Sequence, residues 1–182
     1  TVASACASAT LAMGNALAAL RAGEIDIALA GGSDSLCRLT YAGFNSLRAV
    51  DPRACRPFRS EREGMSIGEG AAVLVLETAA SARARGARIL GWLLGAGASC
   101  DAHHMTAPDP QGAGIARAVE AAFADSGLQA SDIDFVNVHG TGTPHNDAAE
   151  AKMLRAVFGD RLAQLPLTSS KGAVGHYLGA AG

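Results

Sequence analysis

Residues 70–77 read GAAVLVLE, in which four apolar side chains follow one another from Val73 to Leu76. A continuous apolar run, rather than an alternating one, is typical of a strand that is buried on both faces of a sheet. The next segment, Thr78 to Arg85, has the composition of a short helix that Gly86 closes. A buried strand followed at once by a helix predicts a sheet that is covered by helices.

The same alternation of strand and helix continues on both sides of this segment. Upstream, we expect an alanine-rich helix from Cys6 to Arg21. Its lack of a charged face predicts that protein encloses it on nearly all sides, and that part of this cover comes from outside these residues. A short buried strand should follow at Ile25–Ala30 and end at Gly31-Gly32. Further expectations are strands at Ile89–Leu94, Ile133–Val138 and Leu165–Thr168, helices at Gly112–Ser126 and Asp147–Phe158, and irregular structure over residues 36–66. Together they predict an α/β fold.

Composition and charge exclude several classes of protein. The 182 residues carry a formal net charge of −2, so no positive excess draws the chain to nucleic acid or to an anionic membrane. The uncharged start, Thr1 to Leu20, is rich in alanine rather than leucine, which favours a buried helix over membrane insertion. The four cysteines include no C-x-x-C pair, and a chain of this length needs no disulfide framework. We therefore expect a reducing compartment, the cytoplasm.

The first candidate for chemistry is the segment Ser4-Ala5-Cys6-Ala7-Ser8, where the expected helix begins. Amide groups and the dipole at a helix N-terminus favour an anion, so they stabilise a thiolate at Cys6. Small neighbours allow a substrate carbonyl to approach the sulfur, and nearby backbone N–H groups can stabilise an oxyanion. A buried structural cysteine fits this segment equally well.

Two histidine segments are the other candidates. His139 follows an expected strand and begins the glycine turn HGTGTP, and active-site groups of open α/β sheets commonly lie at such a strand end. Lys171 precedes His176 by five residues in a second glycine-rich stretch, which could place a cation and an imidazole around one cavity. Taken singly, either histidine could equally have a structural role.

Metal and nucleotide sites are disfavoured by spacing. His103 and His104 are adjacent, so they would point apart on a regular backbone, and no H-E-x-x-H pattern occurs. The glycines after His139 match neither the P-loop nor the dinucleotide fingerprint. We therefore expect no metal and no nucleotide.

Taken together, the segments around Cys6, His139 and Lys171 to Gly182 resemble the β-ketoacyl-acyl-carrier-protein synthase family. The resemblance lies in the cysteine motif, in H-G-T-G-T and in K-x-x-x-G-H-x-x-G-A-A-G, and it extends over essentially all 182 residues. A cysteine with two histidines is similar to the elongating type of synthase. The stretch DAHHMTAP, residues 101–108, looks most like the second elongating class of bacterial fatty-acid synthesis.

The resemblance implies a thiolase-like fold with αβαβα layers, incomplete in this chain. Residues 1–182 would form a partial synthase domain, with the end of the N-terminal half at about 1–80 and most of the C-terminal half at about 81–182. Much of the first half, and the glycine-rich phenylalanine loop of the family, would lie outside these residues. A glutamate that normally follows the second histidine motif is also absent.

The resemblance also implies an acyltransferase reaction, the decarboxylative condensation of an acyl-cysteine enzyme with malonyl-acyl carrier protein. It assigns Cys6 as nucleophile, His139 and His176 as enolate-stabilising groups, and Lys171 as the cation that orients His176. Thr141 and Thr143 would hydrogen-bond the pantetheine arm. The substrates are carried on the phosphopantetheine of acyl carrier protein, no other cofactor is needed, and a homodimer is expected.

Three other functions stay open beside fatty-acid synthesis. A ketosynthase of a polyketide or polyene pathway would use the same residues. A non-catalytic partner subunit would share the fold, although retention of Cys6, His139 and His176 argues against it. A thiolase acting on coenzyme A thioesters would need a second catalytic cysteine, which no motif in the chain suggests.

Overall fold

The computed structural model describes all 182 residues, which divide into two compact units. The first unit contains residues 1–35, 69–96 and 177–182, and the second contains residues 36–68 and 97–176. The chain passes from one unit to the other after Ser35, Gly68, Ala96 and His176. Both units therefore combine segments that are far apart in sequence.

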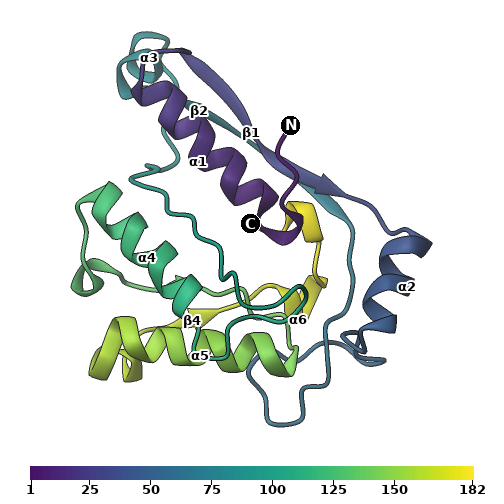
Figure 1. The fold of residues 1–182 in the computed structure, drawn as a ribbon. Coiled ribbons are helices and arrows are strands. Elements are labelled where there is room, and N and C mark those ends of the chain that lie inside the picture. Colours follow the sequence, from purple (N-terminus) through teal and green to yellow (C-terminus); the bar gives the residue numbers. More distant parts are fainter. The chain divides into compact units, whose positions relative to one another are not determined.

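Helices and short strands alternate along the chain, as the α/β prediction requires (Figure 1). None of the helices has both the length and the apolar character needed to cross a bilayer. In the first unit the elements are η1 (Ala5–Ala7), α1 (Ser8–Arg21), β1 (Ile27–Asp34), β2 (Gly70–Glu77), α3 (Ala79–Ala84) and η4 (Leu178–Ala180). In the second they are α2 (Arg38–Ser46), α4 (Ala113–Ser126), η2 (Ala130–Asp132), β3 (Val136–Asn137), α5 (Pro144–Phe158), η3 (Gly159–Ala163), β4 (Leu167–Thr168) and α6 (Lys171–Val174).

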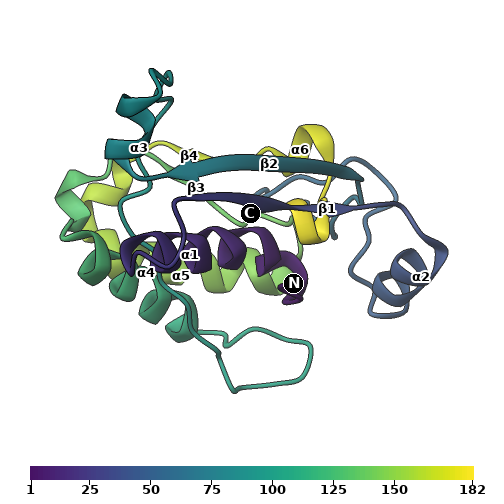
Figure 2. The same cartoon turned by 90° about the horizontal axis from the view of Figure 1, so that it is seen from above.

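The first unit is built on an antiparallel ribbon of β1 and β2, in register from Ile27 opposite Glu77 to Asp34 opposite Gly70. Helix α1 packs along one face of this ribbon (Figure 2). The other face exposes apolar side chains, with Leu29 and Val75 opposite each other across the two strands. Val73, Leu74 and Val75 point alternately to the two faces and are each more than half exposed, so within this chain β2 is not buried on both faces as its apolar run predicted.

Two expectations for the elements of the first unit were wrong. Strand β1 does not end at Gly31-Gly32 but continues to Asp34, because these glycines allow close approach: a Cβ atom on Gly31 would lie 2.0 Å from the Ala72 carbonyl oxygen. Residues 89–94 form no strand, since they pair with no other strand of the chain. Within these residues helix α1 buries only Ala9 and Leu20, so the expected enclosure on nearly all sides is not supplied by this chain.

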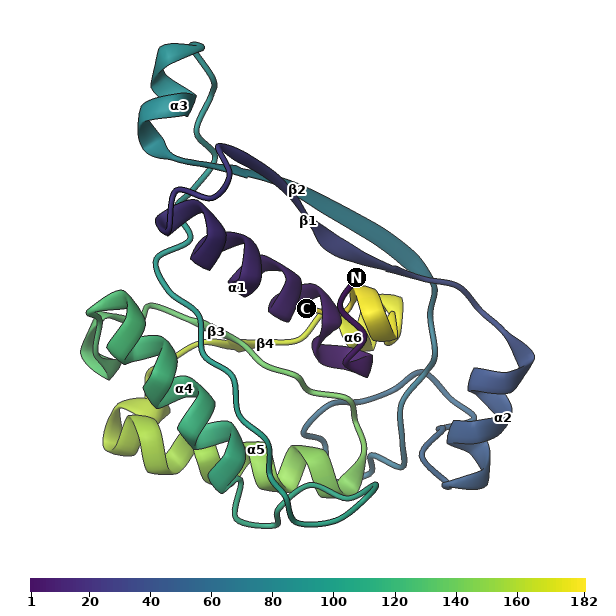
Figure 3. The same ribbon diagram turned by 45° about the horizontal axis from the view of Figure 1, so that its top comes forward.

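The second unit has its core between helices α4 and α5 and the parallel pair β3 and β4, which Figure 3 shows together. The rings of Phe123 on α4 and Phe158 on α5 meet edge to face at 6.5 Å between centroids. The buried cluster consists of Val138, Met153, Leu154, Phe158 and Leu165. This packing places Val138, the residue after β3, against the C-terminal half of α5.

Residues 36–66 are less irregular than expected. They contain helix α2, whose N-cap is Cys37, and its sulfur accepts a hydrogen bond from the Thr40 N–H at 3.4 Å. The rest of the segment is a long loop that closes on itself through a bridge between Val50 and Met65. Asp51 is buried in this loop, and its carboxylate accepts a hydrogen bond from the Arg53 backbone N–H and pairs with Arg56. These contacts lower the pKa of Asp51.

Candidate functional site

Cys6 lies in the first unit, within the 3-10 turn η1 that leads directly into α1. Its side chain is half-buried. The Ser8 hydroxyl shapes this turn, because it donates to the Ala5 carbonyl oxygen at 2.7 Å and accepts from the Ser4 N–H at 2.9 Å. Ala5 has a φ of +44°, a left-handed conformation that a residue with a Cβ adopts only at a cost. The residue before Cys6 is therefore held in strained backbone, as is common at functional sites.

The other five candidate residues lie together in the second unit. The imidazole rings of His139 and His176 meet edge to face, with 5.2 Å between centroids and 83° between planes. His139 follows the end of β3, and His176 follows the short helix α6. His176 is fully buried, and His139 is partly buried. The structure thus brings the two histidine motifs to one place.

Two carboxylates from α5 hold the glycine turn that begins at His139. Glu150 accepts hydrogen bonds from the backbone N–H groups of His139 at 2.6 Å and Gly140 at 2.9 Å. Asp147 accepts one from the Gly142 N–H at 3.2 Å. The turn needs its glycines, since Gly142 has a φ of +77° and a Cβ atom there would lie 2.7 Å from the Gly64 carbonyl oxygen.

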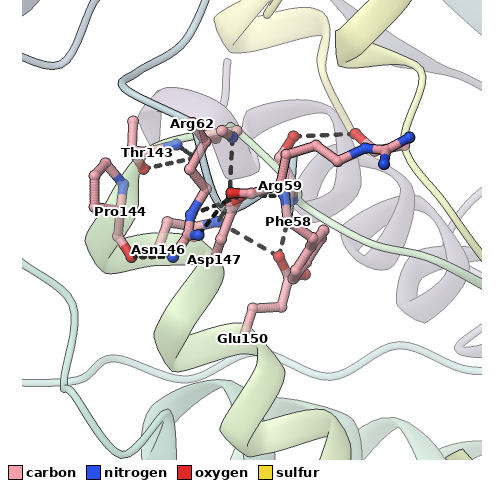
Figure 4. A network of polar contacts seen from close by, with 12 residues as sticks. Phe58, Arg59, Arg62, Thr143, Pro144, Asn146, Asp147 and Glu150 are labelled. Carbon is pink, nitrogen blue, oxygen red and sulfur yellow. Dashed lines mark hydrogen bonds and ion pairs between the residues drawn. The ribbon is translucent and has the colours of Figure 1, made fainter. Parts of the chain in front are cut away.

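Asp147 also holds the long loop of residues 50–68 (Figure 4). Its second oxygen accepts a hydrogen bond from the Phe58 N–H at 2.7 Å and lies 3.6 Å from the Arg62 Nε atom. Phe58 has a φ of +61°, so this contact secures a strained backbone position. Arg62 donates in addition to the Pro144 carbonyl oxygen at 3.3 Å. One buried carboxylate therefore fastens both the loop and the glycine turn.

Sequence reasoning missed both Asp147 and Glu150. A signal was present, because two carboxylates three residues apart lie on one face of a helix, and this helix starts just after the glycine turn. Both side chains are almost completely buried, although carboxylates on helices are usually exposed. Most of their hydrogen-bond donors are backbone N–H groups, which leave no trace in the sequence.

The environment keeps the His139 imidazole neutral. Burial lowers the pKa of His139 to about 4, the nearby Lys171 charge acts in the same direction, and the Asp147 charge opposes it. A neutral imidazole has one N–H donor and one acceptor nitrogen, so at pH 7 His139 can donate a hydrogen bond without giving up a full charge. Burial also raises the pKa of Glu150, while its hydrogen bonds from Gly140 and His139 oppose the shift.

Lys171 and the two threonines complete the set. Lys171 is the first residue of α6 and is buried. The hydroxyl oxygens of Thr141 and Thr143 lie 2.8 Å apart, and Thr141 is the more buried of the two. The second unit therefore offers two imidazoles, a buried cation and two hydroxyls, a combination suited to stabilising negative charge on an oxygen.

Known protein families match both halves of the chain. The family described as "Beta-ketoacyl synthase, N-terminal domain" matches residues 1–82, and "Beta-ketoacyl synthase, C-terminal domain" matches residues 90–182. The 3-oxoacyl-[acyl-carrier-protein] synthase 2 of Staphylococcus aureus is 40% identical over 98% of this chain and 46% of its own length.

Solved structures of ketosynthases are also similar to this chain. The ishigamide ketosynthase/chain length factor superposes with a TM-score of 0.94 at 46% identity, over 100% of this chain and 44% of that one. A type II polyketide ketosynthase, solved with its acyl-carrier protein and bound to a hexaketide, has a TM-score of 0.94 at 35% identity, over 97% and 45%.

The chain has the layered thiolase-like fold of the ketosynthases, present here in part. It belongs to the β-ketoacyl synthase family. It spans about half the length of the relatives that it matches.

Proposed function

We propose that the full-length protein is an elongating β-ketoacyl-acyl-carrier-protein synthase, an acyltransferase of fatty-acid biosynthesis. The observation that carries this proposal is the edge-to-face pair of His139 and His176, in which burial keeps His139 neutral. Two imidazole donors beside each other fit an enolate oxygen, the charge that forms when a malonyl thioester loses carbon dioxide. Cys6, in its strained turn before α1, supplies the nucleophile.

The first half of the proposed reaction is acyl transfer. The Cys6 thiolate attacks the carbonyl carbon of an acyl thioester on acyl carrier protein. The new carbon–sulfur bond forms on Cys6, the bond to the pantetheine sulfur breaks, and the carrier leaves as its thiolate. The amide groups at the start of α1 favour the thiolate form of Cys6.

The second half is condensation. Malonyl-acyl carrier protein loses carbon dioxide, and the electron pair of the broken carbon–carbon bond forms an enolate. His139 and His176 donate hydrogen bonds to the enolate oxygen, which are stronger in the transition state than in the ground state. The enolate carbon then attacks the acyl-Cys6 carbonyl, the thiolate of Cys6 leaves, and β-ketoacyl-acyl carrier protein is the product.

The remaining residues have supporting roles in this proposal. The buried charge of Lys171 lowers the pKa of His139 and orients His176. Thr141 and Thr143 bind the pantetheine arm. The substrates arrive on the phosphopantetheine of acyl carrier protein, and no further cofactor takes part. The active form is a homodimer in the cytoplasm, and residues 1–80 and 81–182 contribute to its N-terminal and C-terminal halves.

A polyketide or polyene ketosynthase is the second candidate function. It is favoured by the similarity to the ishigamide and hexaketide-bound ketosynthases, whose fold over this chain matches with the same TM-score. The two candidates share the reaction and differ in the acyl chain that they extend. A screen of acyl-carrier-protein substrates, saturated chains against polyketide or polyene chains, distinguishes them.

The nucleophile is tested with cerulenin, an epoxide that alkylates acyl-accepting cysteines. The full-length protein is incubated with the inhibitor, and the adduct is mapped by mass spectrometry. We expect modification of Cys6 in preference to the exposed Cys37 and Cys100, and loss of acyl transfer in Cys6→Ala. Uniform or absent labelling would instead support a non-catalytic subunit. Acylation that persists at another residue would refute Cys6 as the nucleophile.

A further inference from the structure

Beyond the residues that take part in the proposed reaction, Cys55 is a buried thiol with a defined contact. Its side chain is 3% exposed, and its Sγ atom donates to the Lys171 carbonyl oxygen at 2.9 Å. Cys55 also lies against both histidine segments. A Cβ atom on Gly142 would be 3.3 Å from the Cys55 Cβ, and one on Gly172 would be 3.5 Å from the Cys55 carbonyl oxygen. The thiol thus occupies the space between the His139 turn and α6.

Ser66 contacts His176, which follows the C-terminal end of α6. Its carbonyl oxygen accepts a hydrogen bond from the His176 N–H at 2.7 Å, and two residues later the Gly68 N–H donates to the His176 carbonyl oxygen at 3.0 Å. These two bonds form the parallel bridge between Ile67 and His176. The backbone of His176 is therefore held on both sides by residues 66–68.

Cys55 and Ser66 are themselves joined. The Cys55 backbone N–H donates to the Ser66 Oγ atom at 3.0 Å, and the same hydroxyl donates to the Arg53 carbonyl oxygen at 3.3 Å. A closed ring of contacts results, from Cys55 to Lys171, along α6 to His176, and back through Ser66. The ring contains the residue that orients the second histidine and the histidine itself.

We infer that Cys55 and Ser66 are positioning residues for His176, and that the ring keeps its imidazole in place for the decarboxylation step. This inference rests on the proposed function. Loss of the thiol donor removes the contact between Cys55 and the Lys171 carbonyl oxygen, which also accepts from the Gly175 N–H, so the start of α6 loses an attachment to the loop. A displaced histidine weakens hydrogen bonds made in the transition state, which lowers kcat rather than raising KM.

The test compares Cys55→Ala with Cys55→Ser in the full-length protein, because a serine hydroxyl can still donate to the Lys171 carbonyl oxygen. We expect Cys55→Ala to lower kcat for malonyl-acyl-carrier-protein decarboxylation by about tenfold, the effect of one lost hydrogen bond, with KM and Cys6 acylation unchanged. Cys55→Ser should recover most of the rate. The exposed Cys100 gives the matched control, and Cys100→Ala should leave the rate unchanged.

Hydrogen exchange of residues 171–176 gives a readout that does not depend on activity. Exchange at the His176 amide should be faster by about tenfold in Cys55→Ala and in Ser66→Ala, and close to wild type in Cys55→Ser. Equal rates and equal exchange in folded Cys55→Ala, or a Cys55→Ser variant that behaves like alanine, would overturn the inference. If the wild-type protein shows no decarboxylation, the proposed function fails, and the exchange measurement still decides whether the ring positions His176.

Discussion

Glu150 on helix α5 accepts a hydrogen bond from the backbone N–H of His139 at 2.6 Å. The Glu150 carboxylate thus contacts the backbone of His139 and not its imidazole ring. Because the same carboxylate also accepts from the Gly140 N–H, it fixes the direction in which the chain leaves β3. The position of the His139 ring therefore depends on a residue eleven positions later in the sequence.

Replacing Glu150 with alanine should destabilise the full-length protein by about 2–6 kcal/mol. Two buried N–H groups would lose their acceptor, and each unsatisfied group costs about 1–3 kcal/mol. Glu150→Gln should cost less, because its amide oxygen still accepts one of the two bonds. Chemical denaturation measures both differences. The exposed Glu120 on α4 is the matched control, and an equal effect of Glu120→Ala and Glu150→Ala would contradict this role.

Substitution of Gly142 tests whether the turn needs its glycine for conformation or for space. Gly142 and Gly127 have similar φ values, +77° and +72°, but a Cβ atom on Gly127 would meet nothing within 4 Å. Gly127→Ala should therefore cost about 1 kcal/mol from backbone strain alone. Gly142→Ala should cost clearly more and also lower condensation activity, since its Cβ would press on the Gly64 carbonyl oxygen. Equal losses of stability in the two variants would show that crowding at Gly142 is unimportant.

Much of the fold follows from local sequence patterns. The apolar run of residues 70–77 predicted β2 with the observed bounds, and the amphipathic segment beginning at Gly112 predicted α4 to within one residue. Helix α2 was missed because its N-cap is Cys37, and a cysteine sulfur is a weak acceptor that is seldom used as a cap. The continuation of β1 through Gly31 depends on the close approach of Ala72, which is distant in sequence.

The sequence motifs identified the candidate side chains of the site. The contacts that hold these side chains in place could not be predicted. His139, Lys171 and His176 stand in glycine-rich motifs whose resemblance to a known family identified them. The contacts that hold these residues join side chains to the backbone, as Glu150 does with His139 and Cys55 with Lys171. Such contacts require only a donor or acceptor at the right distance, so no spacing in the sequence reveals them.

Removal of either imidazole should suppress decarboxylation of the malonyl substrate. In His139→Ala and His176→Ala, loss of a donor to the enolate oxygen should lower the rate by about 10²–10³, while cerulenin still labels Cys6. His145 is the matched control, because it is exposed in the first turn of α5. Release of carbon dioxide from labelled malonyl-acyl carrier protein measures the rate. Unchanged release in both site variants would refute the assigned role.

The lowered pKa of His139 predicts a specific dependence of stability on pH. The folded state holds this pKa at about 4, against about 6.5 in the unfolded chain, so between these values the unfolded state binds more protons. Stability from His139 is therefore fully present above pH 6.5 and is lost as the pH falls to about 4. At about 1.4 kcal/mol per pH unit, the largest possible loss is about 3 kcal/mol.

The measurement compares the wild-type protein with His139→Asn, whose amide does not titrate in this range. Denaturation curves at several values between pH 7 and pH 4.5 should show the wild type losing more stability than the variant. Carboxylates titrate in both proteins, so the difference between the two curves isolates the histidine. Parallel curves would mean that His139 has the same pKa in the folded and unfolded states. Its imidazole would then become charged below about pH 6.5, and burial would not keep the ring neutral.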